Sequence, residues 1–203
     1  MNNIKLALIP LLSLSLASTL QAEVLEIDKG IYQVTYDTNL EQPLKVSYAL
    51  GRANTVKAAD RKGMNFKKEP GVHTSDDKDY YKNVWDKGHM APAGSFSNNE
   101  ENLKLTFSYL NSALQHEKLN RGAWKQLEAA VRGWAEYEKL HVVNEIWFSP
   151  TSIKLPTGAT VPDGFMKIIH ALQWEKCFFF VNEAPTETWE NYEVPCNVEG
   201  IRG

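Results

Sequence analysis

The chain has 203 residues, with 22 Lys and Arg against 25 Asp and Glu, and its formal net charge at pH 7 is -3. A mildly acidic protein has no global field that attracts nucleic acid, so any nucleic-acid binding has to be local. The length suits one well-cored domain, and no linker, repeat or low-complexity segment divides it.

Residues 1–22 have the pattern of a signal peptide. Lys5 precedes an apolar run over 6–16, and small and polar residues follow as far as Ala22, where we expect cleavage. The run is shorter than the roughly 20 apolar residues that a membrane span needs. We therefore expect an exported protein, periplasmic or secreted, with no stable membrane association, in which residues 23–203 form a single domain.

Apolar patterning predicts strands on both sides of a long polar segment. Alternating, β-branched and aromatic runs predict these strands over 31–36, 44–50, 140–148, 165–172 and 177–182. Residues 51–88 lack a clear period, and such long connections in compact domains are often functional. The order of strands, then a long loop with helices, then strands indicates one α+β domain.

Two helices are predicted between the strands, over 100–114 and 121–137. In the second helix an apolar stripe of helical period faces the core, formed by Trp124, Leu127, Val131 and Trp134. Asn120 stands where an N-cap would stand, which is its simplest interpretation.

Cys177 and Cys196 are the two cysteines of the chain. An isolated pair in an exported protein is typical of a disulfide, although two buried free thiols would give the same sequence. Closing a loop of this length would stabilise the fold by roughly 3 kcal/mol.

His89 is the strongest candidate for a catalytic base. It follows Gly88, which permits close backbone approach, and it precedes the small apolar segment 90–93 that could bury the imidazole. A neutral imidazole can take a proton from water near neutral pH. The remaining histidines have no such setting: His73, His116, His141 and His170.

Several polar residues around the second helix suit phosphate and metal chemistry. The amide oxygen of Asn120 is a suitable ligand for Mg²⁺, which takes few protein ligands. Arg61, Arg121 and Arg132 can each bind phosphate in a bidentate manner, although a surface arginine is usually only solvated. Glu128 could orient a water near the metal or simply pair with Arg132, four residues on.

At this point the motifs resemble those of a known family. Asp86–Ala93 resembles the Asp-Arg-Gly-His signature of the DNA/RNA non-specific endonucleases, which have the ββα-metal fold. The segments 60–66, 107–115 and 119–128 resemble further motifs of that family in the right order and spacing. The resemblance runs over residues 45–172, most of the chain after the signal peptide, and it implies a ββα-metal nuclease domain over 23–203 with a central antiparallel sheet.

The resemblance also implies roles for single residues. His89 is then the general base, and Arg61 stabilises the charge on the scissile phosphate with Glu128 shaping the metal and water network. Asn120 is the direct protein ligand of Mg²⁺, with Mn²⁺ as an alternative ion. The reaction is hydrolysis of DNA and RNA phosphodiester bonds to 5′-phosphate products, which is mostly positioning and charge stabilisation.

The substrate-binding residues that we expect are Lys87, Asn111, Arg121 and Arg132. Lys87 replaces the family's arginine, keeping the charge but losing the planar fork. Two other functions stay open: a catalytically inactive protein of this fold that binds nucleic acid or a partner, and a phosphodiesterase with another substrate. The sequence also leaves open an inhibitor protein as a partner, the oligomeric state, and the preference for DNA or RNA.

Overall fold

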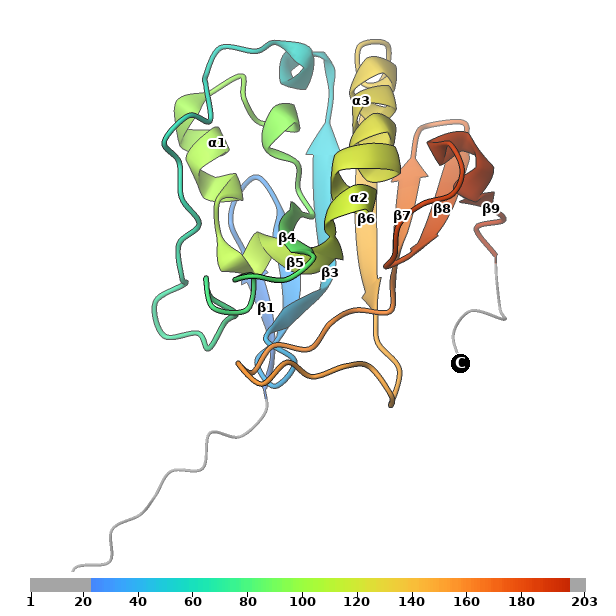
Figure 1. Cartoon of the computed structure of the whole chain (residues 1–203). Coiled ribbons are helices and arrows are strands. Elements are labelled where there is room, and N and C mark those ends of the chain that lie inside the picture. Colours follow the sequence, from blue (N-terminus) through green and yellow to red (C-terminus); the bar gives the residue numbers. More distant parts are fainter. Residues whose placement is uncertain (1–22, 198–203) are drawn as a thin grey trace, which may run out of the picture.

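A computed structural model describes residues 23–197 of the chain, so the predicted signal peptide lies outside the described residues. An antiparallel sheet of seven strands forms the centre, in the order β1-β2-β3-β6-β7-β8-β9 (Figure 1). These strands are β1 (Val24–Asp28), β2 (Gln33–Asp37), β3 (Gln42–Leu50), β6 (Leu140–Trp147), β7 (Gly164–His170), β8 (Glu175–Val181) and β9 (Glu193–Val194).

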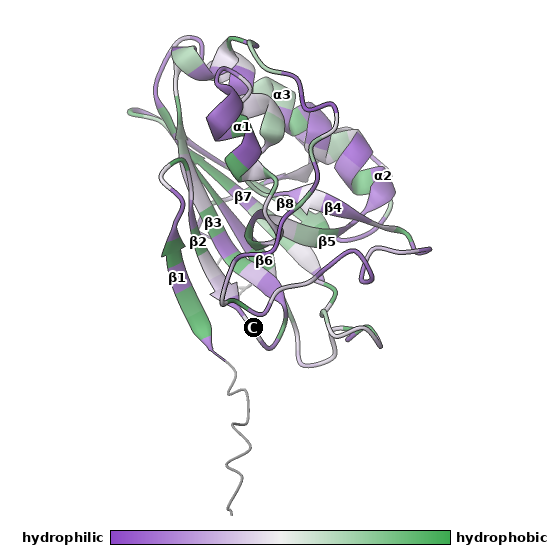
Figure 2. Cartoon of the chain, turned by 90° about the vertical axis from the view of Figure 1, so that its left-hand side faces the viewer, coloured by the Kyte–Doolittle hydropathy of each residue, from purple (hydrophilic) through white to green (hydrophobic). Residues whose placement is uncertain are grey.

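A second layer covers one face of this sheet, and Figure 2 shows the two layers edge-on. It contains a separate two-stranded sheet, β4 (Trp85–His89) with β5 (Ser112–His116), and the helices. The helical elements are η1 (Arg52–Thr55), η2 (Ala93–Ser95), α1 (Glu100–Thr106), η3 (Tyr109–Asn111), α2 (Glu117–Leu119), η4 (Asn120–Trp124), α3 (Lys125–Trp134) and η5 (Trp189–Tyr192).

The core lies between the two layers because the strands are apolar on that side. In β6 every second residue is buried, including Leu140, Val142 and Ile146. Trp124 of the helical layer is fully buried, and its ring centroid lies 5.6 Å from that of Phe165 and 5.7 Å from that of Phe180. The indole therefore docks the start of α3 onto β7 and β8.

The predicted strands are confirmed, each shifted by a few residues at its ends. The short strands β1, β4, β5 and β9 were not expected from the sequence. The long segment 51–88 is irregular as predicted, apart from the single turn of η1 and the first residues of β4.

The helix predicted over 100–114 is wrong in its second half. The helix α1 ends at Thr106, and the chain continues through η3 into the strand β5. Four of the five residues of β5 are buried, so the strand shows no alternation of apolar and polar residues. A short strand buried on both faces resembles a buried helix in sequence, which explains the error.

The helix predicted over 121–137 begins earlier and ends earlier. The helical run starts at Glu117, where His116 Nδ1 accepts a hydrogen bond from the Lys118 N–H at 3.2 Å, and it ends at Trp134. Asn120 has helical backbone angles inside this run, so its predicted role as an N-cap is wrong. Between Asn120 and Trp124 the run is kinked at Gly122, whose φ of -104° and ψ of -115° are not helical, so α2 and α3 are two helices joined at this glycine.

The apolar stripe of this helix is confirmed. Trp124, Leu127 and Val131 are buried, and the ring of Trp134 packs against Trp174 at a centroid distance of 5.6 Å. Among the described residues, none of the helices has the length and apolar character needed to cross a membrane.

The predicted disulfide is also confirmed, because Cys177 and Cys196 are bonded. The bond ties the end of the described chain to β8. Between the two cysteines, η5 packs its aromatic side chains on the same strand, with Trp189 against Phe178 at 5.7 Å between ring centroids.

Candidate active site

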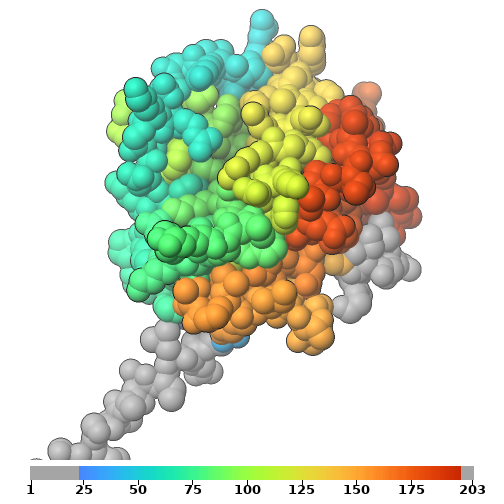
Figure 3. Space-filling view, in the orientation of Figure 1, coloured from blue at the N-terminus to red at the C-terminus, as the bar shows by residue number. Residues whose placement is uncertain are grey.

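A cleft of about 820 Å³ opens where the long loop, β4 and the start of the α2–α3 run meet (Figure 3, where the cyan, green and yellow surfaces adjoin). It collects all but one of the predicted site residues. These are Arg61, Lys87, His89, Asn120, Arg121, Glu128 and Arg132.

Pairing between β4 and β5 positions His89 at the floor of the cleft. Gly88 lies opposite Ala113 in the ladder, and His89 lies opposite Ser112. A Cβ on Gly88 would lie 2.4 Å from Gln115 Oε1 and 2.6 Å from Gln115 Cβ. Glycine is therefore required next to the histidine because the neighbouring strand approaches too closely for any side chain.

The imidazole of His89 is held between two aromatic rings. Its centroid lies 4.8 Å from that of Phe66 and 4.9 Å from that of Phe107, the latter edge-on. Nε2 is buried and has no hydrogen-bond partner among the described residues. Burial of Nε2 leaves Nδ1 as the candidate nitrogen for contact with a water in the cleft.

Burial keeps this histidine neutral. The whole residue is only half-buried, but the ring is enclosed, and its desolvation lowers the pKa of His89 to about 3, with the charge of Arg61 acting in the same direction. At neutral pH the imidazole is therefore unprotonated and can accept a proton.

Asp86 orients Asn120. The Asn120 Nδ2 donates to Asp86 Oδ2 at 2.8 Å, while Asn120 Oδ1 accepts no hydrogen bond from the described residues. An amide whose nitrogen is committed in this way presents its oxygen to the cleft. Arg121 donates to the same carboxylate through Nε at 2.8 Å and Nη2 at 2.7 Å, and it also pairs with Glu117 at 3.2 Å.

The oxygen ligands that this cleft offers fit a hard cation. Asn120 Oδ1 is free and fixed, and the carboxylates of Asp86 and Glu128 line the same cleft. Such ligands are those that Mg²⁺ and Mn²⁺ prefer.

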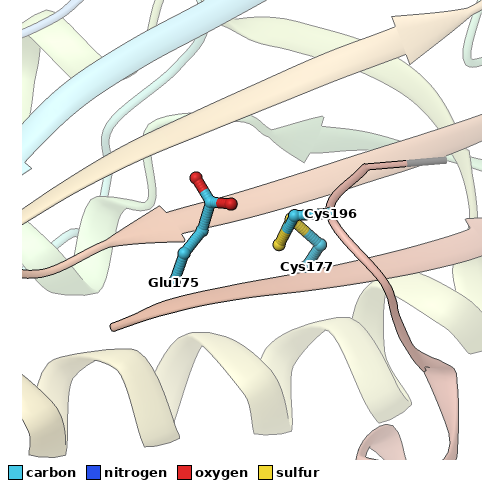
Figure 4. Close-up of side chains that lie close together, drawn as sticks. All are labelled: Glu175, Cys177 and Cys196. Carbon is cyan, nitrogen blue, oxygen red and sulfur yellow. A yellow bond between two sulfur atoms is a disulfide. The ribbon is translucent and has the colours of Figure 1, made fainter. Parts of the chain in front are cut away.

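A second cluster of ligand-type side chains does not fit a metal. Glu175, Cys177 and Cys196 place a carboxylate oxygen and two sulfurs within 4.8 Å of one another (Figure 4). The two sulfurs are bonded to each other, so neither is a thiolate, and the Glu175 carboxylate pairs with His170 Nδ1 at 2.6 Å. Metals bind thiolates rather than disulfide sulfurs.

Positive charge surrounds the open side of the cleft. The Arg61 guanidinium lies 5.5 Å from the ring centroid of Phe107, beside the imidazole of His89. Arg132 of α3 packs over Gly94, where a Cβ would lie only 3.3 Å from Arg132 Nη1. Burial raises the pKa of Glu128, and the charges of Lys167 and Arg132 oppose that rise.

Lys87 lies in the cleft but already has a partner. Its Nζ forms an ion pair with Asp77, and that carboxylate also accepts from the Tyr109 hydroxyl at 2.5 Å. The ammonium lies over three aromatic rings, those of Phe66, Tyr80 and Tyr109, at 5.3 to 5.6 Å from their centroids. The hydrogen bond from Lys87 is the main reason that the pKa of Asp77 is lowered. Asp77 had no sequence signal because it lies in the irregular loop.

Asn111 is not placed for the predicted substrate contact. It is fully buried and does not line the cleft. Its Oδ1 accepts from the Ala91 N–H at 2.7 Å, and its Nδ2 donates to the carbonyls of Ala91 and Thr106, both at 2.9 Å. Asn111 therefore holds the backbone that follows His89. Its amide oxygen and nitrogen are both used inside the protein, which excludes a direct contact with substrate.

Replacing Gly88 with alanine should disturb the histidine strand. The added Cβ would overlap Gln115, and we expect a loss of about 1–3 kcal/mol in the free energy of unfolding, measured by urea denaturation. Gly133→Ala is the matched control, because Gly133 lies in α3 with nothing within 4 Å of a Cβ, and the change should stabilise the helix by up to about 1 kcal/mol. Equal effects of the two changes would contradict the steric argument.

Acid should destabilise the protein through His89. The pKa of His89 is about 3 in the folded chain against an ordinary 6.5, so the unfolded chain binds the proton first as the pH falls. The stability that the neutral ring contributes is complete above pH 6.5 and is lost as the pH falls toward 3. Urea denaturation across this range should show a flatter pH dependence for His89→Asn than for the wild-type protein. An unchanged slope in His89→Asn would show that the ring is not buried in its neutral form.

Comparisons with known proteins agree with this geometry. The chain is 30% identical over 130 residues to the mitochondrial nuclease EXOG of Xenopus laevis. This match covers 63% of this chain and 35% of the relative. It is 28% identical over 123 residues to human mitochondrial endonuclease G, covering 59% of this chain and 41% of the relative. The chain thus spans well under half of the length of these curated relatives.

A solved structure of an EndoG/EndoGI complex has the same fold, with a TM-score of 0.75, 24% identity, and coverage of 84% of this chain and 80% of that chain. This likeness confirms the predicted α+β architecture of the ββα-metal type with its central antiparallel sheet. The expectation of an exported, periplasmic or secreted protein is wrong by the same comparisons, because the curated relatives are named as mitochondrial nucleases. A model of one family matches residues 15–199, nearly the whole chain, and this protein therefore belongs to the DNA/RNA non-specific endonuclease family.

Proposed function

We propose that this chain is a Mg²⁺-dependent endonuclease that hydrolyses phosphodiester bonds of DNA and RNA with little sequence specificity, and that residues 23–203 form its single nuclease domain. One observation carries the proposal. A single cleft brings together the neutral, enclosed imidazole of His89, the oriented amide oxygen of Asn120 and the guanidinium groups of Arg61 and Arg132.

His89 is the general base in this proposal. His89 lines the cleft and is unprotonated at neutral pH, and because its Nε2 is buried we assign Nδ1 as the nitrogen that takes a proton from the water that attacks phosphorus. The flanking rings of Phe66 and Phe107 fix the plane of the imidazole. The base therefore needs no reorientation when a substrate arrives.

Arg61 and Arg132 bind the phosphate from two sides. Each guanidinium donates several N–H groups in a plane, a geometry that matches phosphate oxygens. Both lie on the wall of the cleft near His89, where negative charge grows as the water adds. Arg61 is exposed and not engaged in an ion pair among the described residues, so it is free to contact the scissile phosphate.

Asn120 Oδ1 would hold the Mg²⁺, or Mn²⁺ in its place, with Glu128 of α3 shaping the water around the ion. When bound, the ion supplies positive charge for the phosphate and for the leaving oxygen. Asp86 contributes by fixing Asn120 and Arg121 through three hydrogen bonds. Arg121 and Lys87 line the same cleft, where they would contact the phosphate backbone of the nucleic acid.

Low sequence specificity follows from the kinds of group in the cleft. The positive side chains address phosphate, and contacts to phosphate and sugar carry no sequence information directly. The net negative charge of the chain gives no long-range attraction to nucleic acid. Binding is therefore expected to depend on the few cations of the cleft and to weaken as salt is added.

The test is digestion of a supercoiled plasmid and of a structured RNA, with Mg²⁺ and with excess EDTA. We expect cleavage of both substrates with the ion and none with EDTA. His89→Ala should lower the rate by about 10²–10⁴, the usual value of a general base. His141→Ala is the control, because His141 is exposed on β6 and does not line the cleft.

Two outcomes would reject the proposal. Full activity of His89→Ala would remove the base from the mechanism, and activity in EDTA would remove the ion. Binding of DNA and RNA without cleavage at any Mg²⁺ concentration would instead indicate a catalytically inactive binding protein. Cleavage of small phosphodiesters alone would indicate a phosphodiesterase with another substrate.

Changing Asn120 to alanine should weaken metal binding in particular. The variant loses the amide oxygen that faces the cleft but keeps the Asp86–Arg121 pair. We expect the Mg²⁺ concentration for half-maximal activity to rise by about tenfold or more, the usual cost of losing support at a metal site. Asn191→Ala, an exposed asparagine of η5, should leave the metal titration unchanged. An unaltered titration in Asn120→Ala would exclude Asn120 as the ligand.

A further inference from the structure

An exposed aromatic side chain lines the cleft and has no part in the mechanism above. Tyr81 lies in the loop before β4, its exposed fraction is 67%, and it lines the same cleft as Lys87 and His89. Within residues 23–197 its hydroxyl makes no hydrogen bond, and its ring belongs to none of the hydrophobic clusters of the core. Packing and hydrogen bonding therefore give no reason for a tyrosine at this position, whereas a ligand in the cleft would.

The loop that carries Tyr81 is closed by its own hydrogen bonds. The Tyr81 N–H donates to the Lys78 carbonyl at 3.3 Å, and Asn83 Nδ2 donates to the Asp79 carbonyl at 2.7 Å. Asn83 Oδ1 accepts from the Trp85 N–H at 3.0 Å, which joins the loop to the first residue of β4. The backbone that presents the exposed ring is therefore held in place before a ligand arrives.

Positive charge lies next to this ring. The Lys82 Nζ is 5.0 Å from the ring centroid of Tyr81, and Lys82 has a φ of 53°, in the left-handed region that residues other than glycine seldom adopt. Such backbone outliers cluster at ligand-binding sites, where the surrounding structure maintains them. An exposed aromatic face and an ammonium are thus presented together at the edge of the cleft.

An aromatic ring beside cations matches the chemistry of a single nucleic-acid strand. Proteins that bind single strands stack the bases on aromatic side chains and neutralise the backbone with positive groups. A base inside a duplex has both of its faces covered by the neighbouring base pairs, so it cannot stack on a protein ring. The ring of Tyr81 therefore suits an unpaired base, with Lys82 close enough to contact a phosphate of the same strand.

We propose that Tyr81 is a base-binding residue that stacks on an unpaired nucleobase flanking the scissile phosphate, and that the enzyme therefore acts preferentially on single-stranded DNA and RNA and on unpaired segments. This inference rests on the proposed nuclease function and names its substrate class. It is compatible with low sequence specificity, because every base has an aromatic face and stacking tolerates all of them.

The test removes the ring and the bases in turn. The substrates are a short oligothymidylate and a strand of the same length built from abasic tetrahydrofuran nucleotides, which keeps every phosphate and lacks every base. Tyr81→Ala should lower kcat/KM on oligothymidylate by about 5- to 150-fold, the range expected for the loss of one base stack. On the abasic strand the same change should cost less than about twofold, because the partner of the ring is already absent.

A third substrate tests the preference for unpaired bases. On a relaxed, covalently closed duplex plasmid, which has no strand ends, Tyr81→Ala should also cost less than about twofold. Loss of the same factor on the plasmid as on oligothymidylate would overturn the preference for unpaired bases. Loss of the same factor on the abasic strand, or no loss on oligothymidylate, would overturn the stacking role of Tyr81.

Two variants serve as controls. Tyr81→Phe keeps the ring and removes a hydroxyl that makes no hydrogen bond within the described chain, so it should retain wild-type kcat/KM on oligothymidylate. Tyr137→Ala removes an equally solvated tyrosine, 87% exposed, that does not line the cleft, and it should leave all three substrates unaffected. Thermal unfolding of Tyr81→Ala should match that of the wild-type protein, because the side chain lies outside the core.

A binding measurement separates this proposal from the nuclease function. Fluorescence anisotropy of labelled oligothymidylate in EDTA does not depend on cleavage, and Tyr81→Ala should raise Kd by a similar factor for this strand but not for the abasic one. Inactive wild-type protein that keeps this difference would reject the nuclease function and leave the base contact standing. Equal Kd values of wild-type protein and Tyr81→Ala for oligothymidylate would reject the base contact itself.

Discussion

The Asp86 carboxylate is the contact on which the site depends. It lies on β4, three residues before His89, and it accepts hydrogen bonds from Asn120 Nδ2 and from two nitrogens of Arg121 at the start of the helix. One carboxylate thus joins the strand of the proposed base, His89, to the helix of the proposed metal ligand, Asn120. Its oxygens are charged, so these bonds are stronger than bonds between neutral groups. This junction adds to the pairing of β4 with β5, which leads directly into α2, in holding His89 and Asn120 relative to each other.

Steric and electrostatic constraints act together around that junction. Gly88 lets β4 approach Gln115 of β5, and the next residue, His89, lies between the rings of Phe66 and Phe107. Enclosure keeps the imidazole neutral, which a base requires. Burial also raises the pKa of the Glu128 carboxyl, because it favours the protonated form, and the charges of Lys167 and Arg132 oppose that rise.

Much of this arrangement was predictable from sequence, and the exceptions share a cause. His89, Asn120 and Arg61 carry chemistry that short motifs reveal, and the helix stripe from Trp124 to Trp134 has a clear period. Asn111 was assigned to substrate because an amide in a motif looks functional, yet its hydrogen bonds all go to backbone. The strand β5 has no alternation because it is buried on both faces. Asp77 and Lys167 make long-range contacts that no local pattern records.

Lys87 shows how one departure from the family motif fits its surroundings. The family's arginine is a planar fork suited to two parallel bonds, whereas lysine is a compact point charge. In this chain the position is enclosed by Phe66, Tyr80 and Tyr109 and faces one carboxylate oxygen of Asp77. Aromatic faces attract a compact ammonium without requiring a particular orientation of its N–H groups, so the planar guanidinium of arginine is not needed here. The aromatic enclosure therefore explains why a lysine is accommodated here. The Lys87 ammonium lies in the cleft already paired with Asp77, so a substrate phosphate would have to compete with that carboxylate for it.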